Sequence, residues 1–166
     1  RLRMYVLRAK VVLTDVSDDF VTLGLSGDQA PECLAALFPA LPEQANDLTR
    51  HGELTLIRLA GPTPRFQMLG PVTAMMPLWD ILAATATPVN AAHWTLLEIR
   101  AGIPTIHTET REAFVPQMAN MQLIDGVSFT KGCYTGQEIV ARMQYLGKLK
   151  RRLYLGEVTT ERAPRP

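Results

Sequence analysis

The spacing of apolar residues along this chain changes from the period of a strand to the period of a helix, and it does so twice. The expected strands cover residues 10–16, 20–26, 53–59 and 65–69. Turn-forming residues separate each pair, at 17–19 and at 61–64. A helical pattern follows each pair. Two strand–strand–helix units predict antiparallel sheets with packed helices, an α+β fold rather than a doubly wound one.

The first helical pattern contains one of the two cysteines. Its apolar residues fall at i, i+3, i+4, i+7 and i+8, the spacing of one helix face. They are Ala30, Cys33, Leu34, Leu37 and Phe38. Cys33 is therefore expected to pack in the core.

The second helical pattern carries a proline and a tryptophan. Its apolar stripe consists of Val72, Met75, Met76, Trp79, Leu82 and Ala83. Pro77 interrupts this stripe, so it either kinks the helix or marks where the helix begins. Trp79 is expected to be a core residue.

Composition excludes several classes of protein. The chain has 166 residues, 47% of them hydrophobic, and a net charge of +1, which fits a globular domain without a strong global field. Two cysteines a hundred residues apart, without a Cys-x-x-Cys pair, argue against a disulfide scaffold or a zinc site. His51, His93 and His107 lack ligand spacing, so no metal site is expected. No glycine-rich nucleotide motif, membrane span or secretory signal is visible, and reduced thiols suit the cytosol or the mitochondrial matrix.

The second cysteine lies in an unusual segment, residues 131–138. Gly132 and Gly136 bracket Cys133, and Thr135 with Glu138 has the spacing of a capping box at a helix start. Glu138 and Arg142 then form an i,i+4 pair. A helix entrance and the Lys131 ammonium both favour a thiolate at Cys133. Local chemistry alone leaves a functional and a structural cysteine equally open.

The same segment resembles the signature K-G-C-[FY]-x-G-Q-E of the YgfZ family, the folate-binding relatives of the glycine-cleavage aminomethyltransferase. This family includes mitochondrial iron–sulfur assembly homologues. Two upstream segments are also similar to family patterns. They are 94–104, which resembles W-x-x-x-x-I-x-A-G-[IF]-P, and 114–120, which resembles F-[IV]-P-Q-x-x-N. The resemblance covers nearly the whole chain.

The resemblance implies an aminomethyltransferase-like, folate-binding fold. The cofactor would be tetrahydrofolate or another folate derivative, with Trp94 stacking on its ring. Cys133 would be the functional thiol, assisted by Lys131. Loop support is expected from Gly132, Tyr134, Gly136, Gln137, Glu138 and Arg142.

The function implied is iron–sulfur cluster assembly or repair, and through it tRNA modification, in an accessory factor rather than an enzyme. Its partners would be iron–sulfur assembly proteins or cluster-dependent enzymes, with tRNA contacted at most indirectly and no membrane involved. One alternative is a tetrahydrofolate-dependent aminomethyl or one-carbon transferase. Another is a non-catalytic docking module for cluster-carrying proteins.

The resemblance also predicts a domain organisation. Residues 1–145 would form the folate-binding domain, without its N-terminal part, and residues 146–166 a linker and the first strand of a mostly missing β-barrel. A basic stretch crosses this boundary, with no acid between Glu138 and Glu157. It could contact tRNA or an acidic partner, but solvated linkers and edge strands also carry such charges. Its cations are Arg142, Lys148, Lys150, Arg151 and Arg152.

Overall fold

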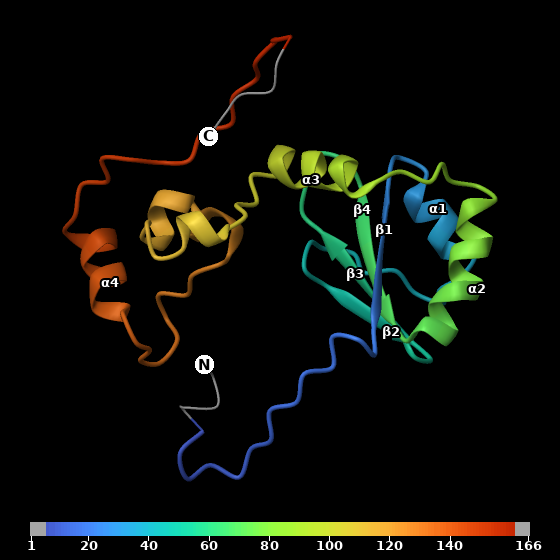
Figure 1. Cartoon of the computed structure of the whole chain (residues 1–166), viewed down its shortest axis with the longest axis horizontal. Coiled ribbons are helices and arrows are strands. Elements are labelled where there is room, and N and C mark those ends of the chain that lie inside the picture. Colours follow the sequence, from blue (N-terminus) through green and yellow to red (C-terminus); the bar gives the residue numbers. More distant parts are fainter. Residues whose placement is uncertain (1–5, 162–166) are drawn as a thin grey trace. The chain divides into compact units, whose positions relative to one another are not determined.

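The computed structural model describes residues 6–161 (Figure 1). The chain divides into two compact units, of which the first ends at Val89 and the second begins at Asn90. The sequence did not indicate this division. The predicted domain boundary at residue 145 stays a prediction.

The first unit contains a four-stranded antiparallel sheet with the order β1-β4-β3-β2. Its strands are β1 (Val21–Ser26), β2 (Leu48–His51), β3 (Leu54–Leu59) and β4 (Arg65–Gly70). A two-residue loop joins β2 to β3, and Gly52 in that loop has φ +57°, which glycine adopts readily. Together with the helices described below, this sheet confirms the predicted α+β class.

Three of the four predicted strands are confirmed, and the prediction for residues 10–16 is wrong. These residues are exposed and form no strand. Asp15 instead accepts hydrogen bonds from the backbone N–H of Ser17 at 3.0 Å and from its hydroxyl at 2.6 Å. These bonds lower the pKa of the Asp15 carboxyl. Such a local turn competes with strand pairing.

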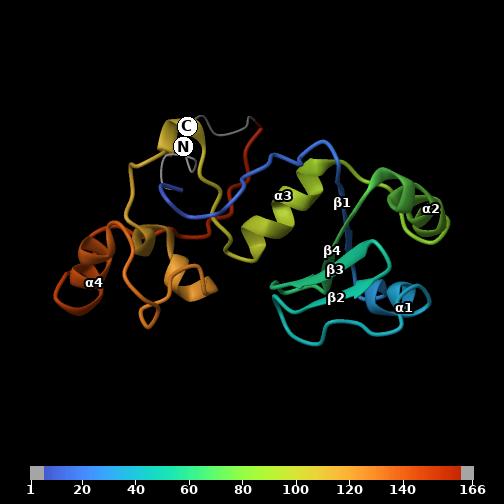
Figure 2. The same ribbon diagram turned by 90° about the horizontal axis from the view of Figure 1, so that it is seen from below.

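The helices α1 (Ala30–Ala35) and α2 (Val72–Ala83) cover one face of this sheet (Figures 1 and 2). Leu25 lies opposite Phe66, and Leu56 lies opposite Met68, so these four side chains share the covered face. The core consists of Leu25, Ala30, Leu34, Phe38, Leu56, Phe66, Met68, Met75, Leu78 and Leu82. Cys33 packs against this core, as its place on the apolar stripe predicts.

The predicted apolar stripe of α2 is only partly right. The helix begins at Val72 and continues through Pro77, so the proline does not mark its start. Met75, Leu78 and Leu82 are its buried residues. Trp79 is 44% exposed, which corrects the expectation that it lies in the core, and Met76 on the same stripe is 59% exposed. The helix has apolar residues on two sides, and the sheet covers only one of them.

The described part of the second unit, residues 90–161, contains two helices and three short 3-10 turns. In chain order they are α3 (Ala91–Arg100), η2 (Thr108–Thr110), η3 (Pro116–Ala119), η4 (Met121–Ile124) and α4 (Gln137–Tyr145). Within its described part, residues 90–161, there is no strand. A strand needs a neighbour for its backbone hydrogen bonds, and the described part of the second unit offers residues 146–161 no other strand to pair with. The first strand of a barrel therefore stays a prediction.

Candidate functional site: the cysteine loop

The loop that contains Cys133 ends where α4 begins. Gly136 is the residue that caps this helix, and its φ of +87° is one that L side chains rarely adopt. The first turn is closed by Gln137 N–H donating to the Tyr134 carbonyl at 3.1 Å. Gly136 is thus needed for the backbone to turn into α4.

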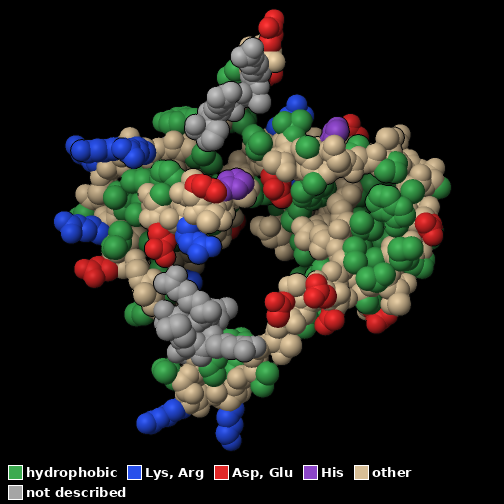
Figure 3. Space-filling model, in the orientation of Figure 1, with side chains coloured by type: hydrophobic (Ala, Val, Ile, Leu, Met, Phe, Trp, Pro, Cys, Tyr) green, Lys and Arg blue, Asp and Glu red, His purple; other side chains and the backbone are tan. Residues whose placement is uncertain are grey.

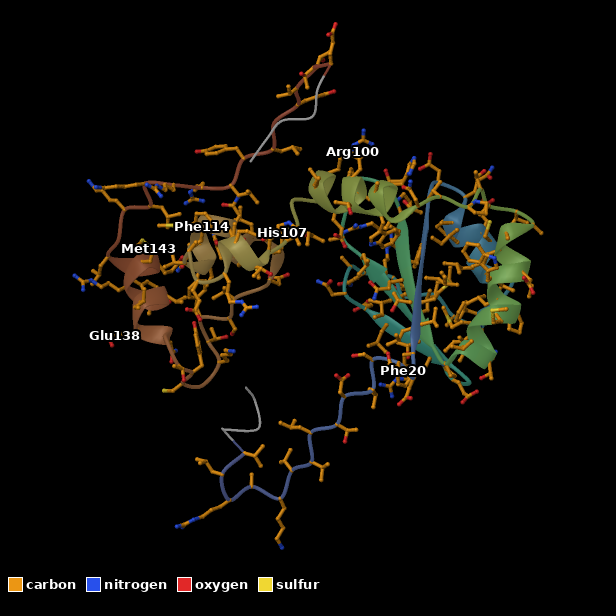
Figure 4. All side chains as sticks on the ribbon, in the orientation of Figure 1. Phe20, Arg100, His107, Phe114, Glu138 and Met143 are labelled. Carbon is orange, nitrogen blue, oxygen red and sulfur yellow. The ribbon has the colours of Figure 1, made fainter. Side chains whose placement is uncertain are left out.

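The predicted capping box is absent. The cap of α4 makes no side-chain hydrogen bond. Because Gly136 occupies the cap position, Thr135 lies one residue too early to reach the N–H of the third helical residue. Glu138 is exposed in the first turn and points away from the rest of the unit (Figure 4), and the described structure shows no ion pair between it and Arg142.

Cys133 itself is exposed, in contrast to the half-buried Cys33. Both cysteines are free thiols. A side chain built at Gly132 or at Gly136 would meet no atom within 4 Å, so the backbone on both sides of Cys133 is open. A ligand or a partner protein can therefore approach the thiol closely.

Lys131 and Ser128 give the start of this loop a defined structure. The Lys131 ammonium lies over the Tyr134 ring, 4.6 Å from its centre, a cation–π contact that spans Cys133. The Ser128 hydroxyl accepts hydrogen bonds from the backbone N–H groups of Thr130 at 3.4 Å and Lys131 at 3.1 Å. The sequence indicated a charge near the thiol but did not indicate that Tyr134 positions it.

A buried glutamine connects α4 to the turn η3. Gln117 is 1% exposed, and its side-chain N–H donates to the Val140 carbonyl at 2.7 Å. Val140 is the buried residue of α4. Gln117 belongs to the F-V-P-Q-x-x-N segment, whose role in holding α4 was missed because a contact across 23 residues leaves no local pattern. This bond fixes the helix that follows the cysteine loop.

Trp94 lies on α3 and is half-buried. The helix begins where the Asn90 side chain accepts a hydrogen bond from Ala92 N–H at 3.1 Å. A cavity of about 270 Å³ elsewhere in the same unit is lined mainly by apolar residues, including Phe114, Pro116 and Met121. Trp94 does not line this cavity.

Residues 6–161 contain neither a metal-binding cluster nor a membrane-spanning helix. In that range no group of three His, Cys, Asp or Glu side chains is placed to hold a metal ion. No helix there is long and apolar enough to cross a membrane.

The fold and the loop define an α+β protein with an exposed cysteine between two glycines, directly ahead of a helix. No family model matches the chain. The tRNA-modifying protein YgfZ of Yersinia enterocolitica is 39% identical over 163 residues, which are 98% of this chain and 49% of that protein. YgfZ of Sodalis glossinidius is 39% identical over 92% of this chain and 46% of its own. YgfZ of Yersinia pestis is 38% identical over 98% of this chain and 49% of its own.

The chain therefore belongs to the YgfZ family. It spans about half the length of the curated relatives that it matches.

Proposed function

We propose that the protein takes part in tRNA modification by supporting iron–sulfur cluster assembly or repair, with Cys133 as its functional thiol. The observation that carries this proposal is the exposure of Cys133 in an open loop ahead of α4. The relatives are named tRNA-modifying proteins, which supports a role in this process.

The loop suits thiolate chemistry. The loop is followed directly by the N-terminal end of α4, and Lys131 adds a cation two residues from the thiol. A thiolate can bind iron or attack a sulfur atom, and both steps need an accessible cysteine. The open backbone at Gly132 and Gly136 allows a cluster-carrying protein to reach it. Iron–sulfur assembly proteins and cluster-dependent enzymes are the proposed partners.

A folate is the proposed cofactor, bound by an aminomethyltransferase-like fold. The half-buried indole of Trp94 fits this role, because a partly exposed aromatic face can stack on a flat pterin ring. When bound, a reduced folate carries one-carbon units. In the complete protein, tetrahydrofolate should quench tryptophan emission, and Trp94→Ala should weaken binding.

Trp79→Phe is the matched control for folate binding. Trp79 is 44% exposed and lines a cavity of about 380 Å³ on the first unit, so its indole is more accessible than the half-buried indole of Trp94. Folate affinity should be unchanged in this variant. Calorimetry that detects no binding to the purified protein would remove the cofactor from the proposal. A loss of binding in Trp79→Phe but not in Trp94→Ala would remove Trp94 as the folate site.

The assembly role is tested in cells that carry Cys133→Ala as their only copy. Iron–sulfur enzymes should lose activity while glycine cleavage continues. Cys33→Ala is the control, because Cys33 packs against the core and lies outside the loop. Folate-dependent one-carbon transfer by the purified protein that survives Cys133→Ala would establish the transferase alternative instead. Full cluster-enzyme activity with Cys133→Ala would also contradict the proposal.

A further inference from the structure

The positive charge of this chain is concentrated in one short stretch. Five cations fall within residues 142–152, here called the basic segment, and no acid lies between Glu138 and Glu157. The remainder of the chain has 12 Lys and Arg residues and 16 Asp and Glu residues, so its net charge is −4. The overall charge of +1 is therefore the sum of a strongly basic segment and an acidic remainder. Its cations are Arg142, Lys148, Lys150, Arg151 and Arg152.

All five cations are exposed, whereas Leu149 between two of them is half-buried. Figure 3 shows Lys and Arg side chains projecting from the side of the second unit where α4 and the chain after it lie. The five charges therefore face solvent, and within residues 6–161 none of them forms an ion pair with an acidic side chain. This arrangement leaves the cations available to a ligand.

The basic segment is fixed at its start by a tight turn after α4. The N–H groups of Leu146 and Gly147 both donate to the Arg142 carbonyl at 2.9 Å. A side chain at Gly147 would lie 2.9 Å from the Met143 Cα and 2.7 Å from its sulfur, so only glycine allows this close approach. Met143 lies on the helix that the turn folds against (Figure 4).

The end of the segment is fixed by Leu153. Its N–H donates to the Met118 carbonyl at 2.9 Å, and its carbonyl accepts from the Asn120 side chain at 2.8 Å. A stretch pinned at both ends loses less conformational entropy on binding than a free linker does. These contacts favour a built binding surface over a solvated linker.

One exposed tyrosine lies within the basic segment and a second lies two residues after it. Tyr145 is 70% exposed and Tyr154 is 83% exposed. Cations that contact phosphates, combined with aromatic rings on which bases stack, are typical of surfaces for single-stranded nucleic acid. Binding to an acidic protein would require the cations and not the tyrosines. The tyrosines therefore favour a ligand that offers both phosphates and unstacked bases.

We propose that the basic segment, with Tyr145 and Tyr154, is an RNA-binding surface for an unpaired stretch such as a tRNA loop. This deepens the proposed function, on which it rests, by giving the protein a direct contact to RNA. It also departs from the sequence-based expectation that tRNA is contacted at most indirectly.

The test is the affinity of the purified full chain for a fluorescently labelled tRNA transcript, measured by anisotropy over a range of salt concentrations. The triple variant Lys150→Gln, Arg151→Gln, Arg152→Gln should weaken binding. For single-stranded contacts it should also reduce the slope of log affinity against log salt by about 2, since each lost phosphate contact removes about 0.7. The matched control carries Arg50→Gln, Arg100→Gln and Arg111→Gln, three exposed cations outside the segment. An equal loss in this control would overturn the proposal.

Stacking is tested separately at Tyr154. Tyr154→Ala should lower affinity roughly 5- to 150-fold, the range for losing one stacked base, whereas Tyr154→Phe should bind as the wild type does. Equal losses in both variants would remove the stacking role. No measurable binding of the wild-type chain to RNA would overturn the proposal and point to an acidic protein as the partner.

The RNA surface and the thiol can fail independently. Cys133→Ala should bind the transcript as tightly as the wild type, because Cys133 lies outside the basic segment. If RNA binding is absent but Cys133 is still required in cells, only the proposed RNA-binding surface is contradicted. If RNA binds but Cys133 is dispensable in cells, the role of the thiol falls and the RNA surface remains.

Discussion

At the scale of single residues, Gly136 decides where α4 begins. Its left-handed φ of +87° sets the cap, and this displaces Thr135 from the position that a capping box requires. The Thr-x-x-Glu pattern in the sequence is compatible with a helix that is capped by Thr135 or by Gly136. The backbone conformation of glycine, which no side-chain pattern reveals, selects the later start.

This conformation predicts a cost for Gly136→Ala. A left-handed conformation costs an L residue about 1–2 kcal/mol, so the free energy of unfolding should fall by that amount. Gly132→Ala is the control, because Gly132 has no positive φ and open space around it, and its effect should stay within about 0.5 kcal/mol. Urea unfolding followed by Trp94 fluorescence in a Trp79→Phe background measures both. Equal stabilities for the two variants would contradict this account of the helix start.

The two cysteines predict different reactivities. Cys133 is exposed and Cys33 packs against the core, so iodoacetamide at neutral pH should alkylate Cys133 much faster in the folded chain. Peptide mass spectrometry at timed intervals gives both rates. In urea the difference should shrink, since burial no longer protects Cys33. A folded chain in which Cys33 reacts as fast as Cys133 would contradict the contrast in exposure.

At the scale of secondary-structure elements, α2 shows how a helix with two apolar sides is positioned. Its residues at i, i+3 and i+7, namely Met75, Leu78 and Leu82, face the sheet. The neighbouring stripe through Val72, Met76 and Trp79 is as apolar but exposed. Hydrophobic periodicity identified the helix and could not choose between its two faces.

Two alanine substitutions on α2 distinguish its buried face from its exposed face. Leu78 is 5% exposed, so Leu78→Ala should destabilise the first unit by about 2–5 kcal/mol. Met76 is 59% exposed, and Met76→Ala should cost less than about 1 kcal/mol. Thermal unfolding of the purified chain, followed by circular dichroism, compares them. A larger loss at Met76 than at Leu78 would mean that the helix is rotated relative to the sheet.

At the scale of the whole molecule, the sequence predicted the α+β class, three strands and the packing of Cys33 against the core, because each depends on local periodicity. It missed β2, whose four residues are too few to show alternation. It also placed a strand at residues 10–16, where the hydrogen bonds of Asp15 form a turn. Local pattern therefore predicted most of the first unit.

The candidate site depended more on contacts between distant residues. Exposure of Cys133 and its place ahead of a helix agree with the sequence pattern. The contacts that fix this region join residues far apart in sequence, such as Gln117 to Val140 and Asn120 to Leu153. Their partners cannot be identified from periodicity or composition. The family resemblance marked Gln117 and Asn120, and only the structure assigns them a role.

The central claim is that tRNA modification depends on the Cys133 thiol. The most direct measurement is the content of thiolated nucleosides in tRNA from cells whose only copy of the gene encodes Cys133→Ser, with protein levels matched to the wild type. We expect these nucleosides to fall to the level of cells that lack the protein, while Cys33→Ser cells keep them, because serine preserves the shape of Cys133 and removes only its thiol chemistry. Wild-type levels of thiolated nucleosides in the Cys133→Ser cells would contradict the account.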